Sequence, residues 1–210
     1  MKPYLPIAGF EREQHFRHFT RNLDLHPVGS ITVRLNCTDL YADAKKQGHR
    51  FFLRYIHAAL RVLNDIPNFK YRLSDRDVEN EYMAFDTIHC SAVVARPDHS
   101  FGFAFFDYIE DYETFEAQAS ASMEAVRQDK NLVSQPRKDL IYVTVVRDID
   151  FTSLHFTPSP ALDIPHLGFG KVVEKDGQLE MAMAIQYLHA FQDGYHIGQF
   201  VNRMQDLIKN

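Results

Sequence analysis

Residues 171–208, KVVEKDGQLEMAMAIQYLHAFQDGYHIGQFVNRMQDLI, contain the pattern that decides the fold. Two runs with β-forming patterns, 171–175 and 178–188, flank Asp176-Gly177. Asp-Gly between such runs favours a type I′ turn, because both central residues of that turn need a positive φ. This stretch therefore predicts an antiparallel hairpin near the end of the chain.

A helix is expected directly after the hairpin. The second strand ends at His189, and Asp193-Gly194 interrupts the pattern before His196. From there, apolar residues recur at spacings of three and four, which is the period of one helix face. These residues are Ile197, Phe200, Val201, Met204, Leu207 and Ile208.

The rest of the chain alternates between helical and strand patterns. We expect helices over 10–21, from Asp39 to Gly48, over 51–64 and over 112–130, and strands over 31–37, 78–85, 88–95, 101–108 and 140–146. No linker or repeat divides the sequence, so residues 1–210 are interpreted as one domain. The order predicts an α/β fold, a two-layer sandwich with a large mixed sheet covered by helices.

Composition limits the classes of function. The chain has 210 residues, of which 45% are hydrophobic, and a net charge of −5, which argues against a nucleic-acid partner. It has neither a run of about 18 apolar residues nor a signal-peptide pattern, so we expect a cytoplasmic protein without a membrane partner. Cys37 and Cys90 lie in apolar runs and are interpreted as buried free thiols rather than a disulfide.

His189 is the first candidate for chemistry. Histidine is the usual general base at neutral pH, and here it follows a strand and precedes a turn. Asp193 could cap the final helix or hold a partner in place. On spacing alone, a surface histidine followed by a capping aspartate is the favoured interpretation. No ligand set for a metal is completed around His189 and His196, so we expect no metal.

The string His189-x-x-x-Asp193-Gly194 resembles the HxxxDG signature of chloramphenicol acetyltransferases, which the catalytic domains of dihydrolipoyl acyltransferases share. Further segments resemble the family in order and spacing. They are 12–16 (REQHF), 65–70 (DIPNFK), Phe151-Thr152-Ser153, which resembles the motif bearing a catalytic serine, and the flanks of His189 at 184–186 and 193–196. The resemblance covers nearly the whole chain.

The resemblance implies roles for four residues. His189 would be the general base that takes the proton of an acceptor hydroxyl, which attacks the thioester of acetyl-CoA directly. Ser153 would donate to the oxyanion of the tetrahedral intermediate. Asp193 would pair with Arg12 and hold the loop that carries His189. Without the family, Ser153 would be interpreted as a turn residue and Arg12 as a solvated surface residue.

The resemblance also implies binding residues. Arg50 and Lys171 match positions near the ribose phosphate of acetyl-CoA, the co-substrate, and no permanently bound cofactor is implied. The acceptor pocket would be lined by Phe19, Phe101 and Phe103, and Leu162 and Ile164 could line it or simply pack. The family forms homotrimers, in which His189 and much of the acceptor pocket would come from different subunits.

Leu188 departs from the family, which usually has two adjacent histidines. Because adjacent strand residues point to opposite faces, Leu188 is expected to face away from the site. Three functions stay open: O-acetylation of chloramphenicol, which the resemblance favours, acetylation of a different hydroxyl, and a homologue that binds a ligand without catalysis.

Overall fold

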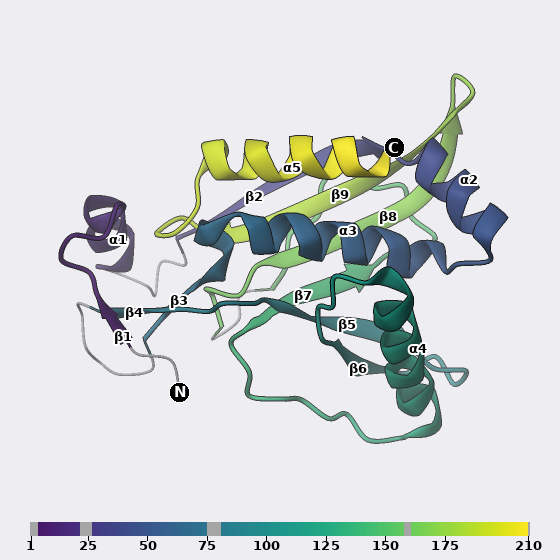
Figure 1. Ribbon diagram of the computed structural model, residues 1–210, viewed down its shortest axis with the longest axis horizontal. Coiled ribbons are helices and arrows are strands. Elements are labelled where there is room, and N and C mark those ends of the chain that lie inside the picture. Colours follow the sequence, from purple (N-terminus) through teal and green to yellow (C-terminus); the bar gives the residue numbers. More distant parts are fainter. Residues whose placement is uncertain (1–3, 22–26, 75–80, 158–160, 210) are drawn as a thin grey trace.

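A six-stranded mixed sheet runs through the computed structural model, which describes residues 4–21, 27–74, 81–157 and 161–209 (Figure 1). The sheet is antiparallel except at the β5–β7 and β7–β8 pairs, which are parallel. Its strands, in spatial order, are β2 (Val28–Asn36), β9 (Gln178–Leu188), β8 (His166–Lys175), β7 (Leu140–Val145), β5 (His89–Ala95) and β6 (Phe101–Phe106).

Helices cover one face of this sheet (Figure 1). They are α2 (Thr38–Gln47), α3 (Phe51–Asp65), α4 (Tyr112–Gln128) and α5 (Gly194–Ile208). Alternation along β9 shows the two faces: Met183 packs in the core beneath the helices, whereas Ala182 and Ala184 belong to a small cluster on the opposite face. The expected α/β fold, with a mixed sheet covered by helices, is confirmed.

A second, three-stranded sheet lies at one end of the molecule beside α1 (Glu13–Thr20) (Figure 1). Its strands are β1 (Tyr4–Pro6), β4 (Glu81–Ala84) and β3 (Tyr71–Leu73), in the order β1-β4-β3. An aromatic cluster joins this sheet to the end of β9, with Phe10 against Tyr82 at 4.5 Å and Phe16 against Phe191 at 5.6 Å between ring centroids. The sequence predicted a strand over 78–85, of which 78–80 lie outside the described residues, but neither β1 nor β3.

Turn residues fall where their chemistry predicts. Asp176 and Gly177 have φ values of 51° and 76°, which completes the hairpin of β8 and β9. Gly48 ends α2 with φ of 75°. The helix expected from Asp39 begins one residue earlier, at Thr38, so Asp39 lies inside its first turn and is not its cap. A short 3₁₀ helix, η2 (Pro67–Lys70), follows α3.

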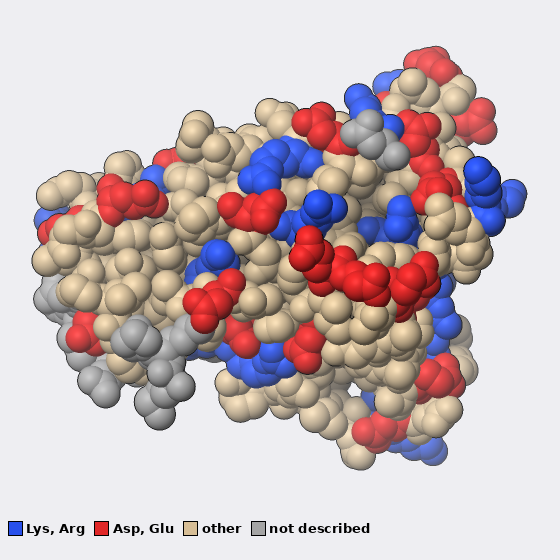
Figure 2. Space-filling model, viewed as in Figure 1, with Lys and Arg blue, Asp and Glu red and all other residues tan. Residues whose placement is uncertain are grey.

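Cys37 and Cys90 are buried and free, as expected. Within the described residues, no helix has the length and apolar character to cross a membrane. On the helix-covered face, basic and acidic side chains are interspersed (Figure 2).

Candidate active site

His189 follows the last residue of β9 and is half-buried. Its backbone N–H donates to the carbonyl of Pro27 at 3.0 Å. The ring stacks on Phe19, with centroids 4.3 Å apart and planes inclined by 14°. Nδ1 is buried and has no hydrogen-bond partner among the described residues. Nε2 is therefore the ring nitrogen that remains available to a reacting group.

Arg12 precedes α1 and is 7% exposed. It is therefore not the solvated surface residue that its position next to a helix would suggest without the family resemblance. Its guanidinium donates to Asp193 Oδ2 at 2.7 Å, to the carbonyl of His189 at 3.3 Å and to the carbonyl of Ala190 at 3.4 Å. The pairing expected between Arg12 and Asp193 is present. Two further bonds, not foreseen from sequence, hold the backbone of the turn itself.

Asp193 combines the two roles that the sequence left open. It is the N-cap of α5, accepting from the N–H of Tyr195 at 3.0 Å, and its side chain also contacts His196 Nδ1 at 2.9 Å. Partial burial alone would raise the pKa of the Asp193 carboxyl. The hydrogen bond and charge of Arg12, with a smaller effect of His196, instead lower this pKa to about 2.

Leu188 is fully buried in the aromatic cluster at the end of the sheet, with Phe10, Phe16 and Phe191. The position at which the family usually has a first histidine is therefore filled by a packing residue.

Ser153 lies on an extended segment that crosses the face of the sheet opposite the helices. Its side chain is exposed and has no hydrogen-bond partner within the described part of the chain. The neighbouring Phe151 is 8% exposed and packs with Ala182 and Ala184 of β9. On the other side, Leu154 lies over Gly168, where an added Cβ would come within 2.4 Å of it. The segment thus buries its apolar residues and leaves Ser153 outward.

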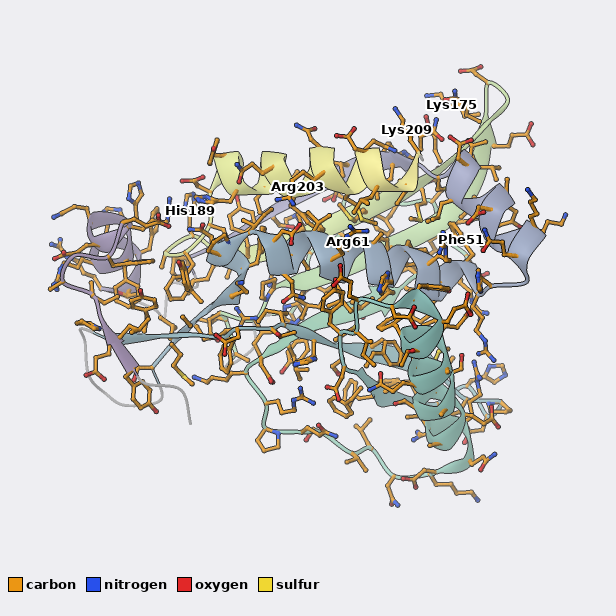
Figure 3. All side chains as sticks on the ribbon, viewed as in Figure 1. Phe51, Arg61, Lys175, His189, Arg203 and Lys209 are labelled. Carbon is orange, nitrogen blue, oxygen red and sulfur yellow. The ribbon has the colours of Figure 1, made fainter. Side chains whose placement is uncertain are left out.

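Arg50 and Lys171 line one groove of about 760 Å³ at the other end of the sheet. Figure 3 shows Phe51, another lining residue, at the far end of α3 from His189. The groove has three more basic residues, Arg96, Arg127 and Arg147, and none of its lining residues is acidic. Such a lining favours an anionic ligand.

The three extra arginines were missed from the sequence. Arg96, Arg127 and Arg147 lie in or near β5, α4 and β7, which only the fold brings together. Arg96 donates to the carbonyls of Val126 and Asn131 at 2.9 and 2.7 Å, so it also fixes the groove wall.

Phe101 and Phe103 lie on the face of β6 that points away from the helices, and their rings are 5.8 Å apart. Phe101 is 47% exposed. β6 is separated from β9 by four strand intervals, which at about 4.8 Å each is roughly 19 Å. These rings therefore do not reach His189 of their own chain.

Leu162 and Ile164 lie on the loop before β8. Ile164 is 2% exposed, and Leu162 packs against the aromatic cluster. Between them, Asp163 is buried and accepts from the N–H of Leu73 at 2.7 Å. Within the single chain, both apolar residues pack, which was the simpler of the two interpretations.

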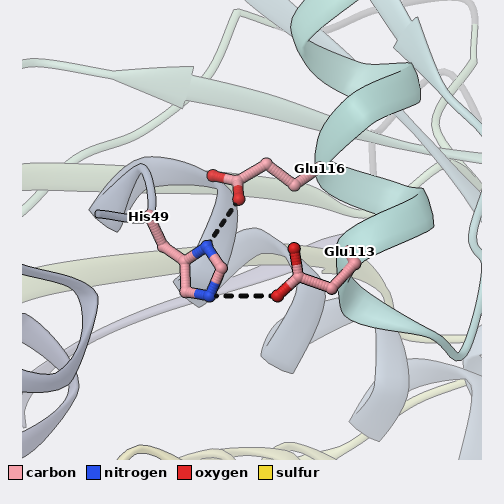
Figure 4. Close-up of side chains that lie close together, drawn as sticks. All are labelled: His49, Glu113 and Glu116. Atoms are coloured by element: carbon pink, nitrogen blue, oxygen red, sulfur yellow. Dashed lines mark hydrogen bonds and ion pairs between the residues drawn. The ribbon is translucent and has the colours of Figure 1, made fainter. Parts of the chain in front are cut away.

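His49, Glu113 and Glu116 are grouped as metal ligands would be (Figure 4). Nδ1 of His49 contacts Glu116 at 2.7 Å and Nε2 contacts Glu113 at 3.3 Å, so the carboxylates approach opposite edges of the ring. Glu116 also accepts from the N–H of Arg50 at 2.7 Å. These polar contacts fasten the start of α3, and with it Arg50, to α4.

Comparisons with known proteins cover nearly the whole chain. A family model described as chloramphenicol acetyltransferase matches residues 4–205. A chloramphenicol acetyltransferase of Klebsiella sp is 26% identical over 206 residues, which cover 95% of this chain and 90% of that protein. One from Bacillus pumilus is 26% identical over 205 residues, with the same coverage.

Solved structures extend the comparison. A chloramphenicol acetyltransferase superposes with a TM-score of 0.88 at 29% identity, covering 99% of this chain and 100% of that chain. The dihydrolipoamide acetyltransferase of Azotobacter vinelandii has a TM-score of 0.68 at 19% identity, covering 94% and 89%, which is a likeness of fold. The strand-end histidine lies beside an arginine–aspartate pair. Because the family model matches nearly the whole chain, the chain belongs to the chloramphenicol acetyltransferase family, which supports acyl transfer as its chemistry.

Proposed function

We propose that residues 1–210 form one acyltransferase domain that transfers the acetyl group of acetyl-CoA to a hydroxyl, with chloramphenicol as the favoured acceptor. The observation that carries this proposal is the fixed imidazole of His189. Its ring stacks on Phe19, its backbone is bonded to Arg12, and Nε2 is the available nitrogen. A general base needs this fixed orientation, because the proton moves along one direction only.

In the proposed reaction, Nε2 of His189 takes the proton of the acceptor hydroxyl, and the oxygen attacks the thioester carbonyl carbon. Negative charge develops on the carbonyl oxygen, and this oxygen accepts a hydrogen bond from the hydroxyl of Ser153. The carbon–sulfur bond then breaks, and the leaving thiolate takes the proton back from His189. A donor such as Ser153 contributes on the order of a hundredfold in rate, because it meets charge that exists only in the transition state.

The basic groove supports acetyl-CoA as the donor. Four cationic side chains besides the wall residue Arg96, without an acidic neighbour in the lining, match a phosphorylated adenosine, and Phe52 offers aromatic surface. Lys171 also connects the groove to the segment of Ser153, since its N–H donates to the carbonyl of Ile149 at 3.0 Å. A thioester extended from this groove would therefore approach Ser153.

The position of Phe101 supports a homotrimer with active sites between subunits. Phe101 lies about four strands from His189 of its own chain and leaves much of its ring exposed. We infer that it lines the acceptor pocket completed by His189 of another subunit.

The test is to incubate the protein with acetyl-CoA and chloramphenicol and to follow release of free thiol. We expect release in the wild type and its loss in His189→Ala. His15→Ala, which removes an exposed histidine of α1, is the matched control and should retain activity.

Two other results would replace this function. Release with another alcohol, but not with chloramphenicol, would indicate a different acceptor. Binding of acetyl-CoA without release in the presence of any alcohol tried would indicate a homologue that binds without catalysis.

A further inference from the structure

The segment that carries Ser153 is tied to β2 on both sides of the serine. Before it, Arg34 of β2 forms a two-pronged ion pair with Asp150, Nη1 to Oδ1 and Nη2 to Oδ2, the second at 2.8 Å. After it, the hydroxyl of Ser30 donates to the carbonyl of Leu154 at 3.4 Å. We call residues 150–154 the Ser153 strap.

The two ties have matching spacing. Arg34 and Ser30 are four residues apart on β2, so both side chains lie on the same face, and their partners Asp150 and Leu154 are also four residues apart. The strap therefore runs against the direction of β2 across the uncovered face of the sheet. In its middle, Phe151 packs from below on Ala182 and Ala184.

The sheet beneath the strap is made of small residues. Gly170 leaves room for Phe151, since an added Cβ there would lie 3.1 Å from the Phe151 ring. These small residues set the distance between the strap and the sheet. Apolar contacts are non-directional, so they do not fix the position of the strap along β2. A planar guanidinium that grips both oxygens of one carboxylate does fix a direction.

We propose that Arg34 and Asp150 are positioning residues for acyl transfer, which hold the Ser153 hydroxyl in register with the developing oxyanion. This inference rests on the function proposed above for Ser153. Neither residue touches substrate in this role. Both side chains are partly exposed, 40% and 34%, so the pair contributes little to global stability and its effect is local.

The expected signature is a loss of turnover without a loss of folding. Ser153→Ala should lower kcat about a hundredfold. Arg34→Ala should lower kcat about tenfold, since a small displacement of a reacting group has effects of this order. KM for acetyl-CoA should stay within about twofold, because Arg34 does not line the basic groove.

A double-variant cycle tests whether Arg34 acts through Ser153. If it does, Arg34→Ala combined with Ser153→Ala should have the kcat of Ser153→Ala alone. Exchange of the charges, Arg34→Asp with Asp150→Arg, should restore part of the lost turnover. The control is Asp43→Ala, which breaks another partly exposed pair, with Arg54 at 2.8 Å, away from the strap, and should leave kcat unchanged.

Hydrogen exchange of residues 149–157 gives a readout that does not depend on the acceptor. Arg34→Ala should accelerate exchange there while the thermal unfolding temperature stays the same. Unchanged exchange would overturn the proposal, as would independent, multiplicative effects of Arg34→Ala and Ser153→Ala on kcat. If chloramphenicol is not acetylated, or Ser153→Ala is fully active, the proposed function fails instead, and the exchange measurement still decides whether Arg34 holds the strap.

Discussion

Arg12 reaches three acceptors of the 189–193 turn with one guanidinium. Because the Arg12 side chain is only 8% exposed and that of Asp193 28%, removal of one partner leaves the other charge uncompensated in a partly buried place. The pair also caps α5 through Asp193, so one carboxylate serves the helix and the turn at once.

Arg12→Ala should lower kcat through disorder of the His189 turn and reduce the free energy of unfolding by about 3 kcal/mol. Steady-state kinetics and urea unfolding measure the two effects. Arg17→Ala, which removes a partly exposed pair with Glu13 on α1, should cost less than about 0.5 kcal/mol. Full activity of Arg12→Ala would contradict the role of the pair.

The same pair predicts a pH dependence of stability. Folding lowers the pKa of Asp193 to about 2, below the value of about 3.9 in unfolded chains. The stabilisation is thus fully present above about pH 4 and is lost as the pH falls through about 2. The difference in unfolding free energy between wild type and Asp193→Asn should be constant from pH 7 to 5 and shrink towards pH 2. A difference that does not change with pH would exclude this coupling.

Phe19 provides the face on which His189 rests, and Nδ1 of that histidine has no partner among the described residues. Phe19→Leu keeps an apolar side chain but removes the flat ring, so we expect kcat to fall about tenfold. Phe19→Tyr keeps the ring and should remain active. Equal activity of the two variants would show that stacking does not orient the base.

At the scale of elements, the pairing of β2 with β9 depends on a close approach. Gly29 lies opposite Tyr187, and an added Cβ would lie 2.4 Å from the Tyr187 ring. That ring is nearly buried and lies 6.0 Å from His189. A change at Gly29 therefore reaches the site through the end of β9.

Gly29→Ala should reduce the free energy of unfolding by about 1–3 kcal/mol, because the buried ring cannot move aside cheaply. Gly198→Ala in α5 is the control, since nothing lies within 4 Å of its added Cβ and alanine favours a helix by up to about 1 kcal/mol. Opposite signs are expected in urea unfolding. A neutral Gly29→Ala would mean that the strand end adapts.

The sequence predicted the elements whose patterns are local. The Asp176-Gly177 turn and the apolar stripe of α5 carry their structure in neighbouring residues. β1 and β3 have three residues each, too few for a period, and depend on pairing with β4. The strap is likewise invisible locally, since Arg34 and Asp150 are 116 residues apart.

The burial of a charged residue, Arg72, could not be predicted from sequence patterns either. Arg72 is fully buried and donates to carbonyls on η2, on β3 and at the start of β7, which ties the small sheet to the large one. By contrast, His189, Ser153, Arg12 and Asp193 were predicted because a family motif fixes their order, which composition and spacing do not.

At the scale of the whole molecule, one edge of the large sheet is rich in exposed apolar surface. Phe101 on β6 and Leu132 and Val133 after α4 are 47%, 59% and 51% exposed. A monomer rarely exposes such residues together, whereas a subunit interface covers them.

Shared active sites in an oligomer can be tested by co-expressing two variants that are each inactive for a different reason. Co-expression of His189→Ala with Phe101→Ala/Phe103→Ala should recover activity above that of either alone, because a mixed trimer contains a site with both parts intact. Light scattering should give a trimer for the wild type, and Phe101→Glu should weaken it, unlike Tyr41→Glu on the helix face, where Tyr41 is similarly exposed at 41%. A wild-type monomer with full activity would rule out shared sites.

The bond between Arg12 and Asp193 also orders events in time. It joins positions 181 residues apart, so during synthesis Arg12 leaves the ribosome long before its partner does. The large sheet also lacks β9 until that part of the chain has been made. A chain truncated before residue 178 has neither β9 nor His189. In refolding of the whole chain, activity should return after most of the helical signal, because the site needs a contact between distant parts of the sequence. Two fragments divided between Arg12 and Asp193 should be active only when they associate.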